Sequence, residues 1–211
     1  MSTRARSTRS GGSASPAGDA VPRLPPIVPQ IRNRGTLGGN VGTASPAGDA
    51  LPPLLAERAE VELASVRGVR TLPLEEFLLG VKRTALAPDE LVTAVHLTPC
   101  GGPQTFMKVG VRNAMVIATA SACLAVDRPS RSVRLALGSV GPTILRCPEA
   151  ESFAAGAVEW SDGTVDEATV EHFGELAAAT ARPIDDHRST AAYRRHAIGV
   201  LARRLLRRAF P

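Results

Sequence analysis

The chain has 211 residues, enough for one large domain or two small ones. Hydrophobic residues make up 44% of it but aromatic residues only 3%, so its core must consist mainly of Ala, Val and Leu. There are 25 basic and 20 acidic residues, and the net charge of +5 raises the hypothesis of nucleic-acid binding. Against that hypothesis, the sequence has no recognition motif and no interleaved aromatic and basic residues of the kind that stack on bases.

The three cysteines limit which metal sites the chain can hold, and they indicate its cellular compartment. Cys100, Cys123 and Cys147 are far apart and form no C-x-x-C pair. An iron–sulfur cluster needs four thiolate ligands, so this chain is not expected to hold one alone, and no zinc site is indicated. The odd cysteine count and the lack of an export signal predict a cytoplasmic protein. No run approaches the roughly 18 apolar residues of a membrane span.

Residues 1–30 are rich in Ser, Gly, Pro, Ala and Arg and have almost no apolar periodicity. This composition predicts a disordered or extended arm. Residues 14–20 of the arm recur letter for letter as residues 44–50. Two copies are too few for a repeat architecture, which needs about three units. A local duplication and a misread gene start both explain the second copy.

The most informative stretch runs from residue 34 to residue 53. Its adjacent glycines, Gly38 and Gly39, allow a backbone to approach a flat or anionic group closely. Short polar side chains surround these glycines, namely those of Thr36, Asn40, Thr43 and Ser45. The spacing matches neither phosphate-binding fingerprint, so the pattern alone favours a glycine-rich surface loop. Asp49 precedes an apolar run and is expected to be the N-cap of a helix.

The next segments predict antiparallel strands. Residues 59–66 alternate apolar and acidic side chains, which is typical of a half-buried strand, and residues 69–72 form its return after a turn. Residues 74–79 are expected to form a short helix that ends at Gly80. Two further strands are predicted over residues 91–97 and 104–111.

Two more strands and three helices complete the prediction. The strands cover residues 118–126 and 133–137, with a polar turn between them. The first helix is expected over residues 148–155. Thr164 and Glu167 match a capping box that opens the second, with Val165, Ala168, Phe173, Leu176 and Ala177 as its buried side. The third covers residues 190–208, where an apolar stripe at helical spacing is formed by Ile198, Leu201, Ala202 and Leu205. Strands followed by segregated helices predict an α+β fold.

Thr36 to Asp49 resembles the second flavin-binding motif in the FAD subunits of molybdenum hydroxylases. That family includes carbon monoxide dehydrogenase medium subunits and the flavin domain of xanthine dehydrogenases. The resemblance continues, in family order, through residues 83–92, 106–112, 133–143 and 184–196. It therefore covers the chain from about Ile31 to the C-terminus, and this long collinear match is far more specific than any one motif.

The resemblance implies a domain organisation. Residues 31–100 would be the second lobe of a PCMH-type FAD-binding domain. Residues 101–211 would be a domain like the C-terminal domain of carbon monoxide dehydrogenase flavoproteins, an antiparallel sheet with helices. Family members carry a small α/β lobe upstream that grips the FAD pyrophosphate, and no segment here resembles it. We therefore expect half of the flavin cleft to be missing from these residues.

The resemblance also implies the cofactor and its ligands. The FAD-binding positions would be Thr36, Gly38, Gly39, Asn40, Thr43, Asp49, Val92 and Lys108. Asp49 would accept from a ribose hydroxyl or adenine amine, and its alternative role is a plain N-cap. Val92 and Lys108 would reach the flavin, and Lys108 would favour its reduced, anionic form. Lys108 can also be read as a solvated strand residue.

Three functional hypotheses follow. The first is a flavin subunit of a molybdenum hydroxylase, an oxidoreductase in which a large partner holds molybdopterin and a small partner holds two [2Fe–2S] clusters. Electrons would leave those clusters through FAD to an external acceptor. The second is a truncated, non-catalytic remnant or assembly subunit that does not retain FAD. The third is nucleic-acid binding through the Arg-rich ends. No His, Ser or carboxylate arrangement indicates a catalytic or metal site of this chain's own.

Overall fold

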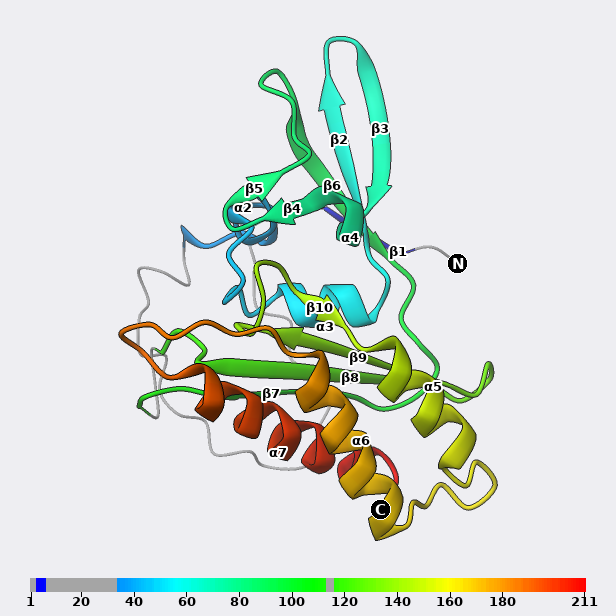
Figure 1. Cartoon of the computed structure of the whole chain (residues 1–211). Helices are drawn as coiled ribbons and strands as arrows, with labels where there is room; N and C mark the ends of the chain where they lie inside the picture. Colours follow the sequence, from blue (N-terminus) through cyan, green and yellow to red (C-terminus); the bar gives the residue numbers. More distant parts are fainter. Residues whose placement is uncertain (1–2, 7–33, 113–115) are drawn as a thin grey trace.

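The computed structural model describes residues 3–6, 34–112 and 116–211 and shows two stacked lobes (Figure 1). Each lobe contains a four-stranded antiparallel sheet, in the strand orders β1-β6-β2-β3 and β10-β9-β8-β7. Three helices cover one face of the second sheet, and the short helix α3 (Leu51–Ala56) lies between the lobes. The predicted α+β fold is confirmed. No helix in the described part of the chain has the length and apolar content of a membrane span.

The upper sheet in Figure 1 is built around β2 (Glu60–Ser65). Its partners are β3 (Gly68–Pro73) and β6 (Leu91–Leu97), and β6 also pairs with β1 (Thr3–Arg6). Val61 and Leu63 have no exposed surface, so one face of β2 is in the core, as its alternating pattern predicted. Smaller elements flank this sheet, namely α2 (Leu37–Thr43), α4 (Leu74–Phe77), β4 (Leu78–Gly80) and β5 (Arg83–Thr84).

The lower sheet is buried on both faces. Its strands are β7 (Gln104–Val109), β8 (Ala120–Asp127), β9 (Ser132–Gly138) and β10 (Leu145–Arg146). Side chains such as Leu124 and Leu135 pack in one core cluster with the three long helices, whereas the small Cys123, Ala125 and Ala136 belong to the cluster around α3. The small side chains let α3 approach the strands closely. This sheet face therefore joins the two lobes.

Three helices form the outer layer: α5 (Pro148–Ala157), α6 (Glu167–Thr180) and α7 (Ala191–Ala209). The prediction of the last helix is confirmed, and the side chain of Thr190 caps it by accepting from the amide of Tyr193. Helices α6 and α7 cross at two glycines. A Cβ atom at Gly174 would lie only 2.9 Å from the carbonyl oxygen of Gly199. The close crossing of α6 and α7 thus requires a glycine at position 174, because a side chain there would clash with the backbone of α7.

Two predicted helix starts are wrong. The N-cap of α6 is Asp166, whose carboxylate accepts from the amide of Thr169 at 2.7 Å. Thr164 cannot serve as the cap because its carbonyl pairs with the amide of Glu159 in a β-bridge. The N-cap of α3 is Ala50, without a side-chain hydrogen bond, and the carboxylate of the expected cap, Asp49, is bound elsewhere.

Other boundaries also differ from the prediction. The helix expected over residues 74–79 ends at Phe77, because the next residues pair with β5 as a strand. The glycine-rich segment contains a short helix, α2, where the pattern alone favoured a loop. Of the residues expected to form the arm, 3–6 form β1, and all the others lie outside the described residues.

Candidate functional site

The glycine-rich segment forms α2 because its own polar side chains satisfy the backbone. The hydroxyl of Thr36 accepts from the amide of Gly39 at 3.0 Å and caps the helix. The hydroxyl of Thr43 donates to the carbonyl of Gly39 at 2.7 Å. Val41 is fully buried and anchors the helix in the core around α3. Both threonine hydroxyls are therefore used inside the segment.

Asn40 is the member of this segment with an unused polar atom. Its side-chain oxygen Oδ1 is buried and has no hydrogen-bond partner among the described residues. A Cβ atom at Gly48 would lie 2.9 Å from that oxygen, so the chain passes close to Asn40 just before Asp49. Leaving a buried polar atom unpaired costs free energy. The geometry thus fits a hydrogen-bond donor from a bound group at this position.

Asp49 and Lys108 meet although they come from different lobes. The ammonium group of Lys108, on β7, forms an ion pair with the carboxylate of Asp49 and donates to the carbonyl of Val116 at 3.2 Å. Both residues are exposed. The pair therefore presents one positive and one negative group at the surface, next to the segment that holds Asn40.

Val92 lies in the upper lobe, where β6 pairs it with Leu63 of β2. Its half-buried side chain packs against the same apolar cluster as Val41. A β-bulge at Glu62 and Leu63 shifts the register next to Val92. Thr36–Thr43 and Val92 thus contact the same apolar cluster, and Gly48 lies against Asn40. Asp49 is joined to Lys108 directly by their ion pair.

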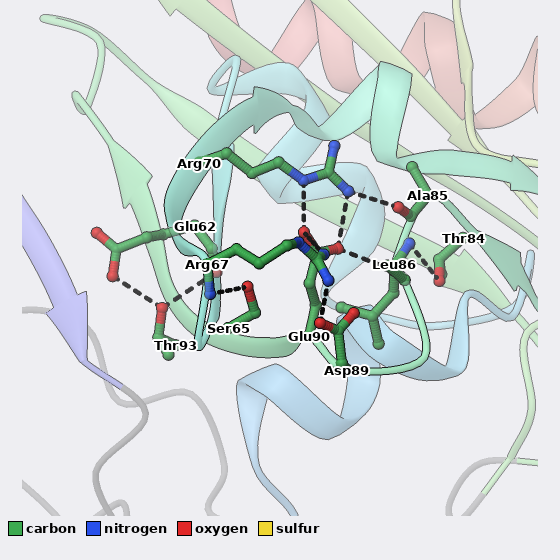
Figure 2. Close-up of polar contacts among 11 residues, drawn as sticks. Glu62, Ser65, Arg67, Arg70, Thr84, Ala85, Leu86, Asp89, Glu90 and Thr93 are labelled. Carbon is green, nitrogen blue, oxygen red and sulfur yellow. Dashed lines mark hydrogen bonds and ion pairs between the residues drawn. The ribbon is translucent and has the colours of Figure 1, made fainter.

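A cluster of ion pairs holds the segment that leads into Val92 (Figure 2). The guanidinium of Arg70 donates to both carboxylate oxygens of Glu90, at 2.7 and 2.8 Å, and to the carbonyl of Ala85 at 2.8 Å. Glu90 also accepts from the amide of Ala87 at 2.8 Å. Arg67 pairs with Asp89 beside it.

The Arg70–Glu90 cluster lowers the pKa of the Glu90 carboxyl group. The hydrogen bond from Arg70 is the main cause that lowers the pKa of Glu90 from 4.5 to about 2, and the amide of Ala87 adds to it. The Glu90 carboxylate is therefore charged at neutral pH and fixes residues 85–90 against β3. Sequence reasoning missed this cluster. The only signal was the opposite charge of two short segments, which becomes specific once β3, β2 and β6 are known to be neighbours.

The histidines and cysteines have separate surroundings. His96 lies 2.9 Å from the carboxylate of Glu62, and His172 packs edge-on against Phe153. All three cysteines are free thiols, and burial raises the pKa of Cys123 and of Cys147 to about 12. Within the described residues, no group of three or more His, Cys, Asp or Glu side chains is placed to hold a metal ion.

Two families match successive parts of the chain. Residues 28–99 match the FAD binding domain in molybdopterin dehydrogenase. Residues 105–209 match the CO dehydrogenase flavoprotein C-terminal domain. All the predicted cofactor-binding residues except Lys108 lie in the first match, and Lys108 lies in the second.

Individual relatives agree with these matches. The nicotine 6-hydroxylase medium subunit of Paenarthrobacter nicotinovorans is 35% identical over 84% of this chain and 62% of its own length. The xanthine dehydrogenase FAD-binding subunit of Escherichia coli O157:H7 is 30% identical over 84% of this chain and 61% of its own. A solved structure of CO dehydrogenase from Oligotropha carboxidovorans superposes with a TM-score of 0.76 at 30% identity, covering 86% of this chain and 63% of the other. The chain thus spans less than two thirds of the length of these relatives.

Proposed function

Because the chain belongs to the FAD-binding medium subunits of the molybdenum hydroxylase family, we propose that it binds FAD and serves electron transfer in a multi-subunit oxidoreductase. In this proposal electrons arrive from iron–sulfur clusters and leave to an external acceptor. Relatives of this chain are named as medium subunits and FAD-binding subunits of dehydrogenases and hydroxylases, which supports the proposal.

One observation carries the proposal: the buried Oδ1 of Asn40 has no partner among the described residues, whereas the hydroxyls of Thr36 and Thr43 beside it are both hydrogen-bonded. Gly38 and Gly39 beside it carry no side chain that would keep a flat or anionic group away. The Asp49–Lys108 ion pair adds an acceptor and a cation within reach of the same chain. These residues fit the polar edges of a flavin nucleotide.

Each residue then has a chemical task. FAD supplies redox chemistry when bound, and the protein supplies binding, orientation and charge. Asn40 accepts a hydrogen bond from the cofactor, and Asp49 accepts one from a hydroxyl or amine. Lys108 holds a positive charge that favours the reduced, anionic form. Val92 contributes an apolar surface, held in position by the Arg70–Glu90 cluster.

Partners are also part of the proposal. The three cysteines of these residues form no cluster-binding set, so the proposal assigns the iron–sulfur clusters to a partner. We expect a large molybdopterin subunit and a small iron–sulfur subunit to bind this one. The substrate of such a complex is chosen on the molybdopterin subunit. Pull-down with the tagged chain, followed by mass spectrometry, tests this expectation.

A second candidate function is an assembly subunit or remnant that keeps the fold without retaining FAD. The observation in its favour is that the hydroxyls of Thr36 and Thr43 are both used inside their own segment, which leaves fewer groups to contact a cofactor. Affinity depends exponentially on the interaction free energy, so a site with fewer contacts binds far more weakly. Little FAD retained during purification would therefore be compatible with both candidates.

A titration with added FAD separates the two candidates. The proposed function predicts saturable binding of one FAD per chain, followed by flavin absorbance and fluorescence. Asn40→Ala and Asp49→Asn should each weaken it about tenfold, because the first loses a buried hydrogen bond and the second loses the charge that strengthens one. Asp162→Asn, which changes an exposed carboxylate in the lower lobe, is the matched control. Absence of saturation would support the assembly role, whereas saturable binding with equal affinity in all variants would refute the assignment of Asn40 and Asp49 to the FAD site.

A further inference from the structure

A cavity of about 430 Å³ lies beside the segment that leads to Asp49, and none of the proposed FAD-binding residues lines it. Its walls come from five separated parts of the chain. These are residues 45–47, the turn at residues 81–82, Ile117, residues 139–142 and the segment from residue 182 to Arg194. Both lobes therefore contribute to the cavity, and its size is that of a small-molecule site.

Two buried residues in the wall each keep one polar atom unpaired. Arg194 is 2% exposed, and its guanidinium donates to the carbonyl of Thr119 at 3.0 Å, to that of Ser139 at 2.8 Å and to Asp186 at 2.5 Å. Its Nε atom nevertheless has no partner among the described residues, and neither has the hydroxyl of Ser139. Both atoms are hydrogen-bond donors, so they lack an acceptor.

The backbone around the cavity is strained. Ser139 has a φ of 63°, and Lys82 has a φ of 53°. Ala44, whose carbonyl accepts from the amide of Lys82, has a φ of 47°. Such conformations are uncommon for residues with a side chain and persist where the surrounding structure fixes them, which is often at ligand sites.

The opening of the cavity carries large apolar side chains that face solvent. Val81, Ile117 and Ile184 are 57%, 62% and 73% exposed, and all three line the cavity. Apolar side chains of this size are mostly buried, and a group of them around a cavity marks a binding surface. A bound molecule with an apolar body would cover them.

The charges of the wall favour an anion. Four cations line the cavity, namely Lys82, Arg182, Arg188 and Arg194, against the single carboxylate of Asp186. That carboxylate is already paired with Arg188 and Arg194. Neither Lys82 nor Arg182 has a carboxylate partner within the described ranges, and the guanidinium of Arg182 donates only to the carbonyls of Ala179 and Ala181.

We propose that this cavity is a second small-molecule site, separate from the flavin residues, for a ligand that joins an apolar ring to an anionic group. The anion lies between Arg182 and the buried donors of Ser139 and Arg194. The ring covers Val81, Ile117 and Ile184. The shared chemistry of the anion is that of a carboxylate or a phosphate, and the site does not require FAD to be bound.

Calorimetric titration of the full chain with four probes tests the proposal. Benzoate and phenyl phosphate carry the ring and the anion, benzamide has the ring without charge, and inorganic phosphate has the anion without the ring. We expect at least one of the two aromatic anions to bind, and the tighter of them identifies the anion. Benzamide and inorganic phosphate should bind at least tenfold more weakly. Equal binding of all four probes, or of none, would overturn the proposal.

Variants place the binding in this cavity. Arg182→Gln and Ile184→Ser change exposed side chains, so the fold should persist, and each should weaken binding of the aromatic anion about tenfold. Arg204→Gln, which removes the same charge from an exposed position on α7, is the control and should bind like the unmodified chain. Lys108→Gln should also bind the probe normally, which separates this site from the flavin site. Unchanged binding in both cavity variants would refute the assignment.

Discussion

Lys108 on β7 pairs with Asp49, which lies 59 residues earlier in the sequence, just before α3. Because both side chains are exposed, their ion pair should contribute less than about 1 kcal/mol to the free energy of unfolding. We expect Lys108→Gln to leave the urea midpoint nearly unchanged while FAD affinity falls about tenfold. Urea unfolding and FAD titration of the same preparation measure the two effects. A variant that loses stability and affinity together would indicate a purely structural pair.

Acid should weaken the Arg70–Glu90 cluster in a defined pH window. The folded pKa of Glu90 lies near 2, below its ordinary value of 4.5. A lowered folded pKa means that the charged carboxylate stabilises the folded state. That stabilisation is fully present above about pH 4.5 and is lost as the pH falls toward 2.

Glu90→Gln measures this effect. The variant should be less stable than the unmodified chain at pH 7, and the difference between their urea midpoints should shrink as the pH falls to 3. Glu76→Gln, which changes an exposed carboxylate of α4, serves as the control. Parallel midpoints for the Glu90 variant and the unmodified chain at every pH would contradict the role of the cluster.

The crossing of α6 and α7 should not tolerate a methyl group. Gly174→Ala places a Cβ atom 2.5 Å from the Arg203 side chain and 2.9 Å from the Gly199 carbonyl, so we expect a loss of about 1–3 kcal/mol. Gly156 in α5 has nothing within 4 Å of its Cβ position. Gly156→Ala should therefore be neutral or stabilise by up to about 1 kcal/mol. Thermal unfolding of the two variants checks the contrast, and equal melting temperatures would count against the close contact.

The thiols should differ in reactivity. Cys147 has no exposed surface, Cys123 is 4% exposed, and burial raises the pKa of both to about 12. Only about one part in ten thousand of such a thiol is ionised at pH 8. Iodoacetamide should therefore modify Cys100 first, slowly, because burial and the nearby Glu57 carboxylate also raise its pKa. Peptide mass spectrometry over time gives the order, and rapid modification of Cys147 in the folded chain would be inconsistent with this core.

The sequence was most informative where periodicity decides structure. The alternation at β2 and the apolar stripe of α7 both predicted elements that the structure contains, because burying one face fixes their period. Predictions failed where a distant group competes for a side chain. Asp49 matches an N-cap locally, but it binds Lys108, and no local pattern reports that partner. The expected capping box failed for a local reason, because the carboxylate of Asp166 accepts from the amide of Thr169 and caps the helix instead.

The candidate sites differ in how far sequence could find them. The segment from Thr36 to Asp49 was identified by its resemblance to a motif, because its glycines and polar residues are contiguous. The second cavity takes its wall from five separated segments, so neither Arg194 nor Ser139 has a neighbour in sequence that indicates its role. Likewise, the Arg70–Glu90 cluster could be recognised only once β3 and β6 were known to lie on either side of β2.

The core around α3 has an evolutionary consequence. The two matched families meet between residues 99 and 105, yet α3 from the first packs on Cys123, Ala125 and Ala136 from the second. A chain cut at that border would expose apolar surface on both pieces. Recombination between relatives at this point would succeed only if the side chains of α3 and those of β8 and β9 were inherited together. The boundary between the two family matches is therefore not a point at which related proteins could exchange one segment independently of the other.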